Sequence, residues 1–231
     1  SIGNGVSIGA HTVISEHAVL SDGVVIGPNS LVAAGVRVGK NSQIGSNVSV
    51  HQETQIGKDV VISSGCVLGS PPFNCFKEQG LWQQGVALGG VTVLDRVHIG
   101  ANTVIDRGSV GDTYLAQGVC IDNLVHIAHD AYIGANTAIA GCAVVGAHTV
   151  VGSDCIIGGA SSIAAYLHLV DDVVISGMTT VSKSVTKPGI YSSGTLAHEH
   201  QRWRKNAARF KRLDEYMTKL HALERRVSSE S

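Results

Sequence analysis

Aliphatic side chains recur at every sixth position along most of the chain. The series runs without a slip over residues 2–68, resumes over 93–105, and continues after a short insertion over 115–181. A small or branched residue stands two positions before most of these aliphatic residues, as Val24 does before Ile26. Residues two apart in an extended strand face the same side, so both point inward. A period of six sustained through 27 hexads predicts an all-β solenoid, a parallel β-helix formed by residues 1–186.

The largest interruption of the repeat is a loop over residues 69–92. It holds two of the three Phe residues, Phe73 among them, and one of the two Trp residues, Trp82. Insertions in a solenoid project from one face and commonly carry its function. The loop is therefore predicted to be a substrate lid or a subunit contact, although a loop that covers an apolar flank fits equally well. A shorter interruption adds four residues around 111–114.

The pattern changes completely near the C-terminus. Residues 187–196 are predicted to be a connector, and residues 197–231 one amphipathic helix. Its heptad-like seam consists of apolar residues spaced by three, four and seven: Trp203, Phe210, Leu213, Met217, Leu220 and Val227. Because so short a helix is marginal alone, bundling in a trimer is its expected use. The segment carries nine Lys and Arg against five Asp and Glu, which indicates either a solvated face or a docking site for an acidic partner.

Composition narrows the classes of function. The 231 residues are 44% hydrophobic, 4% aromatic and 15% charged, with a net charge of −1. These values exclude a disordered chain and disfavour a nucleic-acid binder. No apolar run approaches the roughly 18 residues of a membrane span. The five Cys residues form no CxxC pair, which favours a reducing, cytoplasmic setting, and Cys66 and Cys155 are predicted to be buried and inert. The chain opens at Ser1 rather than Met, as expected if a leader or a domain has been removed.

Several short motifs distinguish this sequence from a generic hexapeptide repeat. They read I-D-R-G at 105–108, G-D-T at 111–113, I-D-N at 121–123, I-A-H at 127–129, I-G-G-A-S at 157–161, K-P-G-I-Y-S-S-G at 187–194 and W-R-K at 203–205. Together they resemble UDP-3-O-acylglucosamine N-acyltransferase of lipid A synthesis. The resemblance implies the left-handed β-helix of hexapeptide-repeat acyltransferases, with three hexads per coil, about nine coils, and residue i stacked on residue i+18.

The resemblance also implies an activity and partners. Enzymes of that family transfer a 3-hydroxyacyl group from acyl carrier protein to the 2-amino group of a UDP-sugar lipid substrate. They are homotrimers with active sites between neighbouring subunits. No cofactor is implied beyond the phosphopantetheine arm of the carrier. The carrier is acidic, so electrostatic steering would bring it to the basic C-terminal segment.

The chain departs from that family in three respects. The family has an N-terminal uracil-binding domain, whereas this chain begins directly in the repeat, so the domain has been removed or nucleotide recognition has been lost. The segment H-I-A-H-D at 126–130 is more similar to UDP-N-acetylglucosamine O-acyltransferase. The family's second histidine aligns with Tyr166, and His168 lies two residues on; either residue is a candidate to replace it.

Acyl transfer to an amine needs a general base, and histidine is the usual choice near neutral pH. Four of the eleven histidines fall within two or three coils: His126, His129, His148 and His168. Spacing does not choose among them, but the resemblance singles out His129 in I-A-H. Asp122 and Asp130 are candidates to orient the base. Neighbouring strand residues point to opposite faces, which favours Asp122 unless a corner intervenes. The backbone N–H of Ala147, one coil above His129, or that of Gly146 is predicted to bind the oxyanion.

Other residues are candidates for substrate binding. Asn123, Asp106 and Arg107 lie in the matched motifs and bind sugar or diphosphate, or else cap turns and pair with one another. Lys183 aligns where the family often carries Arg near the carrier arm, and a lysine there still meets a phosphate as a point charge. Phe73 and Trp82 line an acyl groove or cover the solenoid.

Three other functions compete with N-acyl transfer. His126, His129 and His148 would suit a zinc enzyme of the carbonic anhydrase type, which also uses a trimeric β-helix. A non-catalytic trimeric scaffold would explain the altered second histidine. An acyltransferase with another amino sugar or hydroxyl acceptor, and coenzyme A as donor, is the third. The glycines follow the hexad rule, and the sequence has no GxGxxG or GxxxxGK loop.

Overall fold

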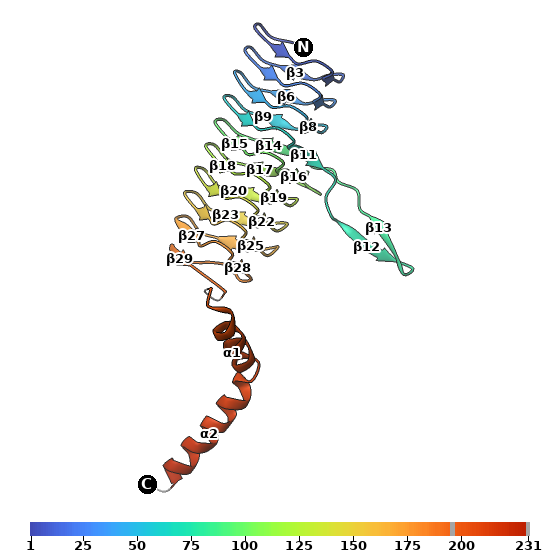
Figure 1. Ribbon diagram of the computed structural model, residues 1–231. Helices are drawn as coiled ribbons and strands as arrows, with labels where there is room; N and C mark the ends of the chain where they lie inside the picture. Colours follow the sequence, from blue (N-terminus) through green and yellow to red (C-terminus); the bar gives the residue numbers. More distant parts are fainter. Residues whose placement is uncertain (195–196, 230–231) are drawn as a thin grey trace. The chain divides into compact units, whose positions relative to one another are not determined.

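The computed structural model describes residues 1–194 and 197–229, which form two separate units, a parallel β-helix and a helical C-terminal segment. Each coil of the β-helix contributes one short strand to each of three parallel sheets, and the coils stack in a column (Figure 1). The first sheet consists of β1 (Ser7–Ile8), β4 (Val25–Ile26), β7 (Gln43–Ile44), β10 (Val61–Ile62), β15 (His98–Ile99), β18 (Cys120–Ile121), β21 (Ala138–Ile139), β24 (Ile156–Ile157), β27 (Val173–Ile175) and β29 (Gly189–Tyr191).

The second sheet consists of β2 (Val13–Ile14), β5 (Leu31–Val32), β8 (Ser49–Val50), β11 (Val67–Ser70), β16 (Val104–Asp106), β19 (His126–Ile127), β22 (Val144–Val145), β25 (Ser162–Ile163) and β28 (Thr180–Val181). The third sheet consists of β3 (Val19–Leu20), β6 (Arg37–Val38), β9 (Gln55–Ile56), β14 (Val91–Val93), β17 (Thr113–Leu115), β20 (Tyr132–Ile133), β23 (Val150–Val151) and β26 (His168–Leu169). The three sheets have ten, nine and eight strands, in line with about nine coils.

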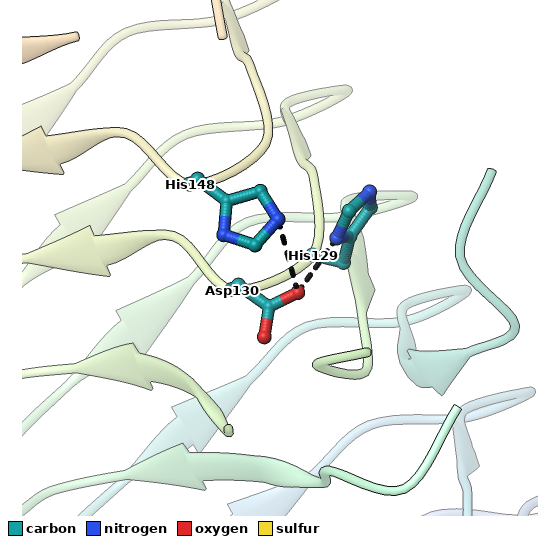
Figure 2. Close-up of side chains that lie close together, drawn as sticks. All are labelled: His129, Asp130 and His148. Carbon is teal, nitrogen blue, oxygen red and sulfur yellow. Dashed lines mark hydrogen bonds and ion pairs between the residues drawn. The ribbon is translucent and has the colours of Figure 1, made fainter. Parts of the chain in front are cut away.

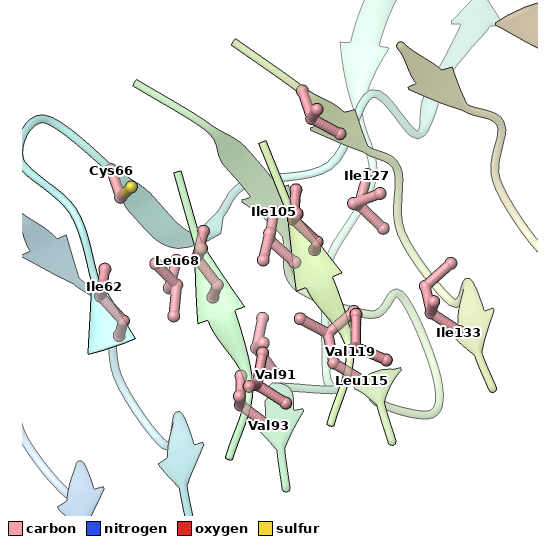
Figure 3. Packing of buried hydrophobic residues seen from close by; sticks show 14 of the residues in the cluster. Ile62, Cys66, Leu68, Val91, Val93, Ile105, Leu115, Val119, Ile127 and Ile133 are labelled. Atoms are coloured by element: carbon pink, nitrogen blue, oxygen red, sulfur yellow. The ribbon is translucent and has the colours of Figure 1, made fainter. Parts of the chain in front are cut away.

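The core is a column of the aliphatic residues of the hexads. Ile26 pairs with Ile44 and Ile121 with Ile139, which is the 18-residue stacking expected from three hexads per coil. From Leu20 to Val181 the side chains at these positions are almost completely buried (Figure 3), whereas Ile2 and Ile8 in the first coil are exposed. Because each coil adds one aliphatic layer per sheet, the interior is too narrow for aromatic side chains, and this explains their scarcity.

Small inward residues bond one coil to the next. The hydroxyl of Ser42 donates to the Gly57 carbonyl and that of Thr137 to the Gly152 carbonyl, both at 2.8 Å. Cys66 and Cys155 occupy the same kind of position and are fully buried, as predicted. Burial raises the pKa of both thiols, more than the nearby backbone hydrogen bonds lower it. Both cysteines are therefore held as unreactive thiols.

One small inward residue has no such partner. The Thr54 hydroxyl is the single buried side-chain oxygen or nitrogen among the described residues that lacks a hydrogen bond. Fifteen residues further on, where Ser42 and Thr137 find a carbonyl, the chain has Gly69 with φ +84° at the start of the large insertion. The large insertion therefore begins at the residue whose carbonyl would otherwise accept the hydrogen bond from the Thr54 hydroxyl.

The large insertion is a two-stranded antiparallel hairpin that projects from the β-helix (Figure 1). Its strands are β12 (Cys75–Glu78) and β13 (Leu81–Gln84), joined at Gln79 and Gly80. Both turn residues have positive φ, as a tight hairpin requires. The ammonium of Lys77 lies 5.4 Å from the centre of the Trp82 ring. The loop predicted for residues 69–92 therefore contains a hairpin that the sequence analysis did not foresee.

The C-terminal part differs from the prediction in two ways. β29 pairs in parallel with β27, so residues 189–191 of the predicted connector are the last strand of the β-helix. The predicted single helix is instead two helices, α1 (His200–Phe210) and α2 (Leu213–Ser229), separated by a turn at Lys211 and Arg212. Residues 195–196 of the connector and 230–231 of the predicted helix lie outside the described residues.

Candidate active site

One edge of the β-helix carries both insertions. At this edge the chain passes from the second sheet to the third, and we call it the insertion edge. It comprises the hairpin segment 71–90, the short insertion 107–112, and the turns 128–131, 146–149 and 164–167. Four of the polar and aromatic residues named from the sequence lie in the last three turns: His129, Asp130, His148 and Tyr166.

The 18-residue period stacks three of these side chains. Asp130, His148 and Tyr166 occupy the same position in successive turns, with φ values of 56°, 55° and 62°. His148 and Tyr166 lie ring over ring, with centroids 4.7 Å apart and planes 11° apart. His148 also approaches His129 edge-on, with centroids 5.2 Å apart. Tyr166, which aligns with the second histidine of the family, therefore contacts His148, and His148 in turn contacts His129.

His129 is oriented by Asp130. The His129 Nδ1 atom lies 2.7 Å from Asp130 Oδ2, and both side chains are nearly buried, at 11% and 10% exposure (Figure 2). The expectation that neighbouring residues would point apart is wrong here, because a corner intervenes: Asp130 has left-handed backbone geometry, and its side chain turns back toward the imidazole. The second nitrogen of the His129 ring points away from Asp130 (Figure 2).

The short insertion holds the Asp130 carboxylate. The Ser109 N–H and hydroxyl donate to Oδ2, and the N–H groups of Val110 and Gly111 donate to Oδ1 at 3.3 and 3.2 Å. Burial alone would raise the pKa of Asp130, but the hydrogen bonds from Ser109, His129 and Val110 outweigh it and hold the pKa well below its usual range. An ionised carboxylate only accepts hydrogen bonds, so this contact requires a proton on His129 Nδ1, and in the neutral imidazole Nε2 is then the acceptor nitrogen.

Asp122 and Asn123 lie at a different edge, in the turn from the first sheet to the second. The Asp122 carboxylate accepts hydrogen bonds from the N–H groups of Asn123 at 2.8 Å and Gly141 at 3.0 Å. The Asn123 side-chain oxygen accepts from the Ala101 N–H at 2.7 Å. Within this chain both side chains cap turns, and the choice of Asp122 over Asp130 as the residue that contacts His129 is wrong.

Asp106 and Arg107 fix the base of the insertions. Asp106 is buried, accepts a hydrogen bond from the Ser70 hydroxyl, and lies 3.5 Å from His126 Nε2. Arg107 Nε donates to the Gly89 carbonyl at 2.7 Å. His126 therefore pairs with a carboxylate of its own, and the predicted histidine trio for zinc is not the cluster that forms.

The remaining candidates are exposed. Tyr166 is 74% exposed despite its stacking on His148, and Phe73 is 82% exposed on the hairpin segment. His168 faces outward from β26, and Lys183 lines a hydroxyl-rich groove of about 360 Å³ at the last coil. Among the described residues, neither His168 nor Lys183 forms an ion pair.

The backbone N–H of Ala147 forms no hydrogen bond with any described residue. At the equivalent position of some turns, a side chain one coil further on accepts the N–H, as Ser64 does for Ser46 and Asp171 does for Ser153, whereas at others, such as Lys40 and Ala135, the N–H donates to none of the described residues. The residue one coil beyond Ala147 is Ala165, whose methyl side chain offers no acceptor. The Gly146 N–H already donates to the Ile163 carbonyl at 2.9 Å. Of the two predicted oxyanion donors, only Ala147 is available.

Two hexapeptide-repeat families match the N-terminal coils. They are the bacterial transferase hexapeptide (six repeats) over residues 35–70 and the hexapeptide repeat of succinyl-transferase over residues 1–37. Among curated proteins, the UDP-3-O-acylglucosamine N-acyltransferase of Pseudomonas fluorescens is 52% identical over 167 residues, 72% of this chain and 48% of the relative. That of Ectopseudomonas mendocina is 50% identical over 73% of this chain and 48% of the relative. The chain is a homologue of the UDP-3-O-acylglucosamine N-acyltransferases.

The chain spans about half the length of these N-acyltransferases. Solved structures match its fold. LpxA from Acinetobacter baumannii has a TM-score of 0.71 at 22% identity over 82% of this chain and 71% of its own. The UDP-N-acetylglucosamine acyltransferase of Francisella novicida has a TM-score of 0.71 at 20% identity over 85% and 71%. This likeness confirms the left-handed β-helix fold expected for the family. In the described part of the chain, no helix combines the length and apolarity needed to span a bilayer.

The residues that hold Asp130 are not evident from the sequence pattern. Ser109, Val110 and Gly111 belong to no predicted site, yet they supply the hydrogen bonds to its carboxylate. The available signal was the four-residue interruption around 111–114, because an insertion departs from the regular coil-to-coil hydrogen bonding one coil before His129.

Proposed function

We propose that this chain transfers a 3-hydroxyacyl group from acyl carrier protein to the 2-amino group of UDP-3-O-acylglucosamine, with His129 as general base. The observation that carries the proposal is the His129–Asp130 pair, nearly buried and 2.7 Å apart, in a chain about 50% identical to N-acyltransferases of that name. The carboxylate orients the neutral ring so that Nε2 is the acceptor, and it stabilises the imidazolium that forms when Nε2 accepts a proton.

The reaction follows from these groups. The uncharged amine nitrogen attacks the thioester carbonyl carbon, and the carbonyl oxygen becomes an oxyanion. His129 Nε2 accepts a proton from the attacking nitrogen. The C–S bond then breaks, the carbonyl reforms as an amide, and the imidazolium returns the proton to the leaving thiolate. The open N–H of Ala147 is the proposed donor to the oxyanion, a role worth about 3–4 kcal/mol in other acyl-transfer enzymes.

The other candidates take supporting roles in this proposal. Tyr166 and His148 form one wall beside His129, and Lys183 offers a charge to a phosphate near the last coil. Phe73 and Trp82 provide apolar surface for the acyl chain. We further propose a homotrimer in a reducing, cytoplasmic compartment, with the basic segment 197–229 attracting the acidic carrier protein.

The test is direct product analysis. The full chain is incubated with 3-hydroxyacyl carrier protein and UDP-3-O-acylglucosamine, and the N-acylated product is sought by mass spectrometry. A parallel reaction replaces the carrier by 3-hydroxyacyl-coenzyme A. The proposal expects amide product and a preference for the carrier-bound donor. A folded trimer that gives no product with either donor, also when supplemented with the N-terminal half of a relative, would contradict it.

Acyl transfer to a hydroxyl group is the second candidate function, because the Asp130 carboxylate forms a hydrogen bond with His129. An amine loses its proton late and easily, whereas a hydroxyl must lose its proton as it attacks and gains more from a base that an anion assists. UDP-N-acetylglucosamine in the same assay distinguishes the two: ester product on that acceptor, without amide product on the other, would favour O-acyl transfer.

A further inference from the structure

The insertion edge brings together three metal-ligating atoms that acyl transfer does not all require. They are Nδ1 of His129, a carboxylate oxygen of Asp130 and Nε2 of His148, and all lie within 4.8 Å of one another. Figure 2 shows the two imidazoles converging on the same carboxylate oxygen from successive coils. We propose that this cluster binds a divalent transition-metal ion, Zn²⁺ above all, and that binding reversibly inhibits acyl transfer. The inhibitory part rests on the proposed function; the binding part does not.

The distances are close to those of a zinc site. Asp130 Oδ2 lies 2.7 Å from His129 Nδ1 and 3.7 Å from His148 Nε2. Zn–N and Zn–O bonds of about 2.0–2.2 Å in a tetrahedron place ligand atoms roughly 3.3 Å apart. The distance from Asp130 Oδ2 to His129 Nδ1 would therefore grow by about 0.6 Å and that to His148 Nε2 would shrink by about 0.4 Å, while the two ring nitrogens, which lie within 4.8 Å of each other, would take the same spacing. Two imidazoles and one carboxylate leave a fourth position for water.

The surroundings also suit a metal. The carboxylate is nearly buried, and the Ser109 and Gly111 donors hold it in place. Such outer hydrogen bonds to a ligand carboxylate are typical of metal sites. The Tyr166 ring, stacked on His148, fixes the second imidazole. Two nitrogen donors and one oxygen favour Zn²⁺, Co²⁺, Ni²⁺ or Cu²⁺ over Mg²⁺ and Ca²⁺, which prefer oxygen ligands alone.

Inhibition follows from the position of one proton. A neutral imidazole carries a single ring proton, and in His129 that proton sits on Nδ1, facing Asp130. A metal ion on Nδ1 displaces it to Nε2. Nε2 is the atom that must accept the proton of the acceptor, so metal-bound His129 cannot act as the base. No proton or electron is gained or lost overall, and removal of the metal restores the first tautomer.

The binding test uses His148→Asn. Residue 148 has φ +55°, and Asn occupies equivalent left-handed turns at Asn41 and Asn136, so the variant should fold. His17→Asn is the matched control, because His17 has φ +60° in a turn of the same edge. Metal-free full chain is titrated with Zn²⁺ by calorimetry, and Co²⁺ binding is followed by visible absorption.

The proposal expects wild type and His17→Asn to bind the same number of equivalents. His148→Asn should lose one equivalent or bind it at least tenfold more weakly, as removal of a ligand requires. Unchanged Zn²⁺ binding by His148→Asn would overturn the metal site. A Co²⁺ spectrum equal in both variants would overturn it as well.

The inhibition test measures acyl transfer with and without Zn²⁺, followed by a chelator. The expected result is reversible loss of activity in wild type and at least tenfold less sensitivity to Zn²⁺ in His148→Asn, judged relative to its own metal-free rate. Full activity of zinc-saturated wild type would overturn the inhibitory part. Absence of transfer in metal-free wild type would instead count against the proposed function, while the titration would still decide on the metal site.

Discussion

Asp130→Asn tests the pairing of carboxylate and imidazole most sharply. The substitution keeps the size and shape of the side chain, removes its charge and replaces one acceptor oxygen by an NH2 donor. Asn is also compatible with the positive φ of residue 130, as it is at several other turns of this chain. An amide has one acceptor oxygen, so the variant cannot serve both the short insertion and His129 Nδ1 as the carboxylate does.

The size of the effect follows from the geometry. A hydrogen bond to a charged group contributes about 1.5–3 kcal/mol. Two unit charges about 4 Å apart interact by about 4 kcal/mol at an effective dielectric constant of about 20, which is an upper limit for the imidazolium and Asp130. A loss of about 2–4 kcal/mol in the transition state corresponds to a rate decrease of roughly 30- to 1,000-fold. We expect this loss mainly in kcat, because the imidazolium forms only during the reaction.

The assay is steady-state acyl transfer with Asp122→Asn as the matched control. Asp122 is a carboxylate on another edge that caps a turn, so its substitution should change the rate by no more than about threefold. Melting temperatures of both variants exclude unfolding as the cause. A fully active Asp130→Asn, or a larger loss in Asp122→Asn, would refute the assignment of Asp130 as the orienting residue.

Three further predictions concern stability. Thr137→Val leaves a buried carbonyl and N–H without a partner and should cost about 1–3 kcal/mol, whereas Thr54→Val should be neutral or stabilising; equal urea midpoints would contradict this. The pKa of Asp130 is lower in the folded state than its unfolded value of about 4, so this group stabilises the fold above about pH 4 and the stabilisation is lost as pH falls toward the folded pKa. Asp130→Asn should therefore show a smaller decline in melting temperature than wild type below about pH 5. A Cβ on Gly134 would meet backbone atoms at 2.3–2.4 Å and one on Gly111 nothing within 4 Å, so Gly134→Ala should lower the melting temperature and Gly111→Ala should not.

The repeat could be predicted from the sequence because it is a local, periodic property. Each hexad buries one aliphatic residue, so positions such as Ile26, Ile121 and Ile139 report the fold independently of one another. The same period predicts that residue 147 lies one coil above His129. The register between strands is usually hard to predict, but here residue i pairs with residue i+18 wherever no insertion intervenes.

Corners were harder to predict because side chains alternate between inward and outward directions only within strands, and not at the turns between them. The rule that neighbours face opposite sides pointed away from Asp130, but a left-handed turn residue does not obey it. The hairpin of residues 75–84 and the break between α1 and α2 also depend on a few turn residues rather than on a period. The contribution of Ser109 could not be predicted, because it requires the path of the short insertion across the next coil.

The measurement that tests the central claim most directly compares acyl transfer by wild type and His129→Ala, with His17→Ala as the control for loss of a histidine at the same edge. The account predicts N-acylated product from wild type and His17→Ala. It predicts a rate at least 100-fold lower in His129→Ala, the minimum expected for loss of a general base. Equal rates in wild type and His129→Ala would contradict the account, because another group would then accept the proton.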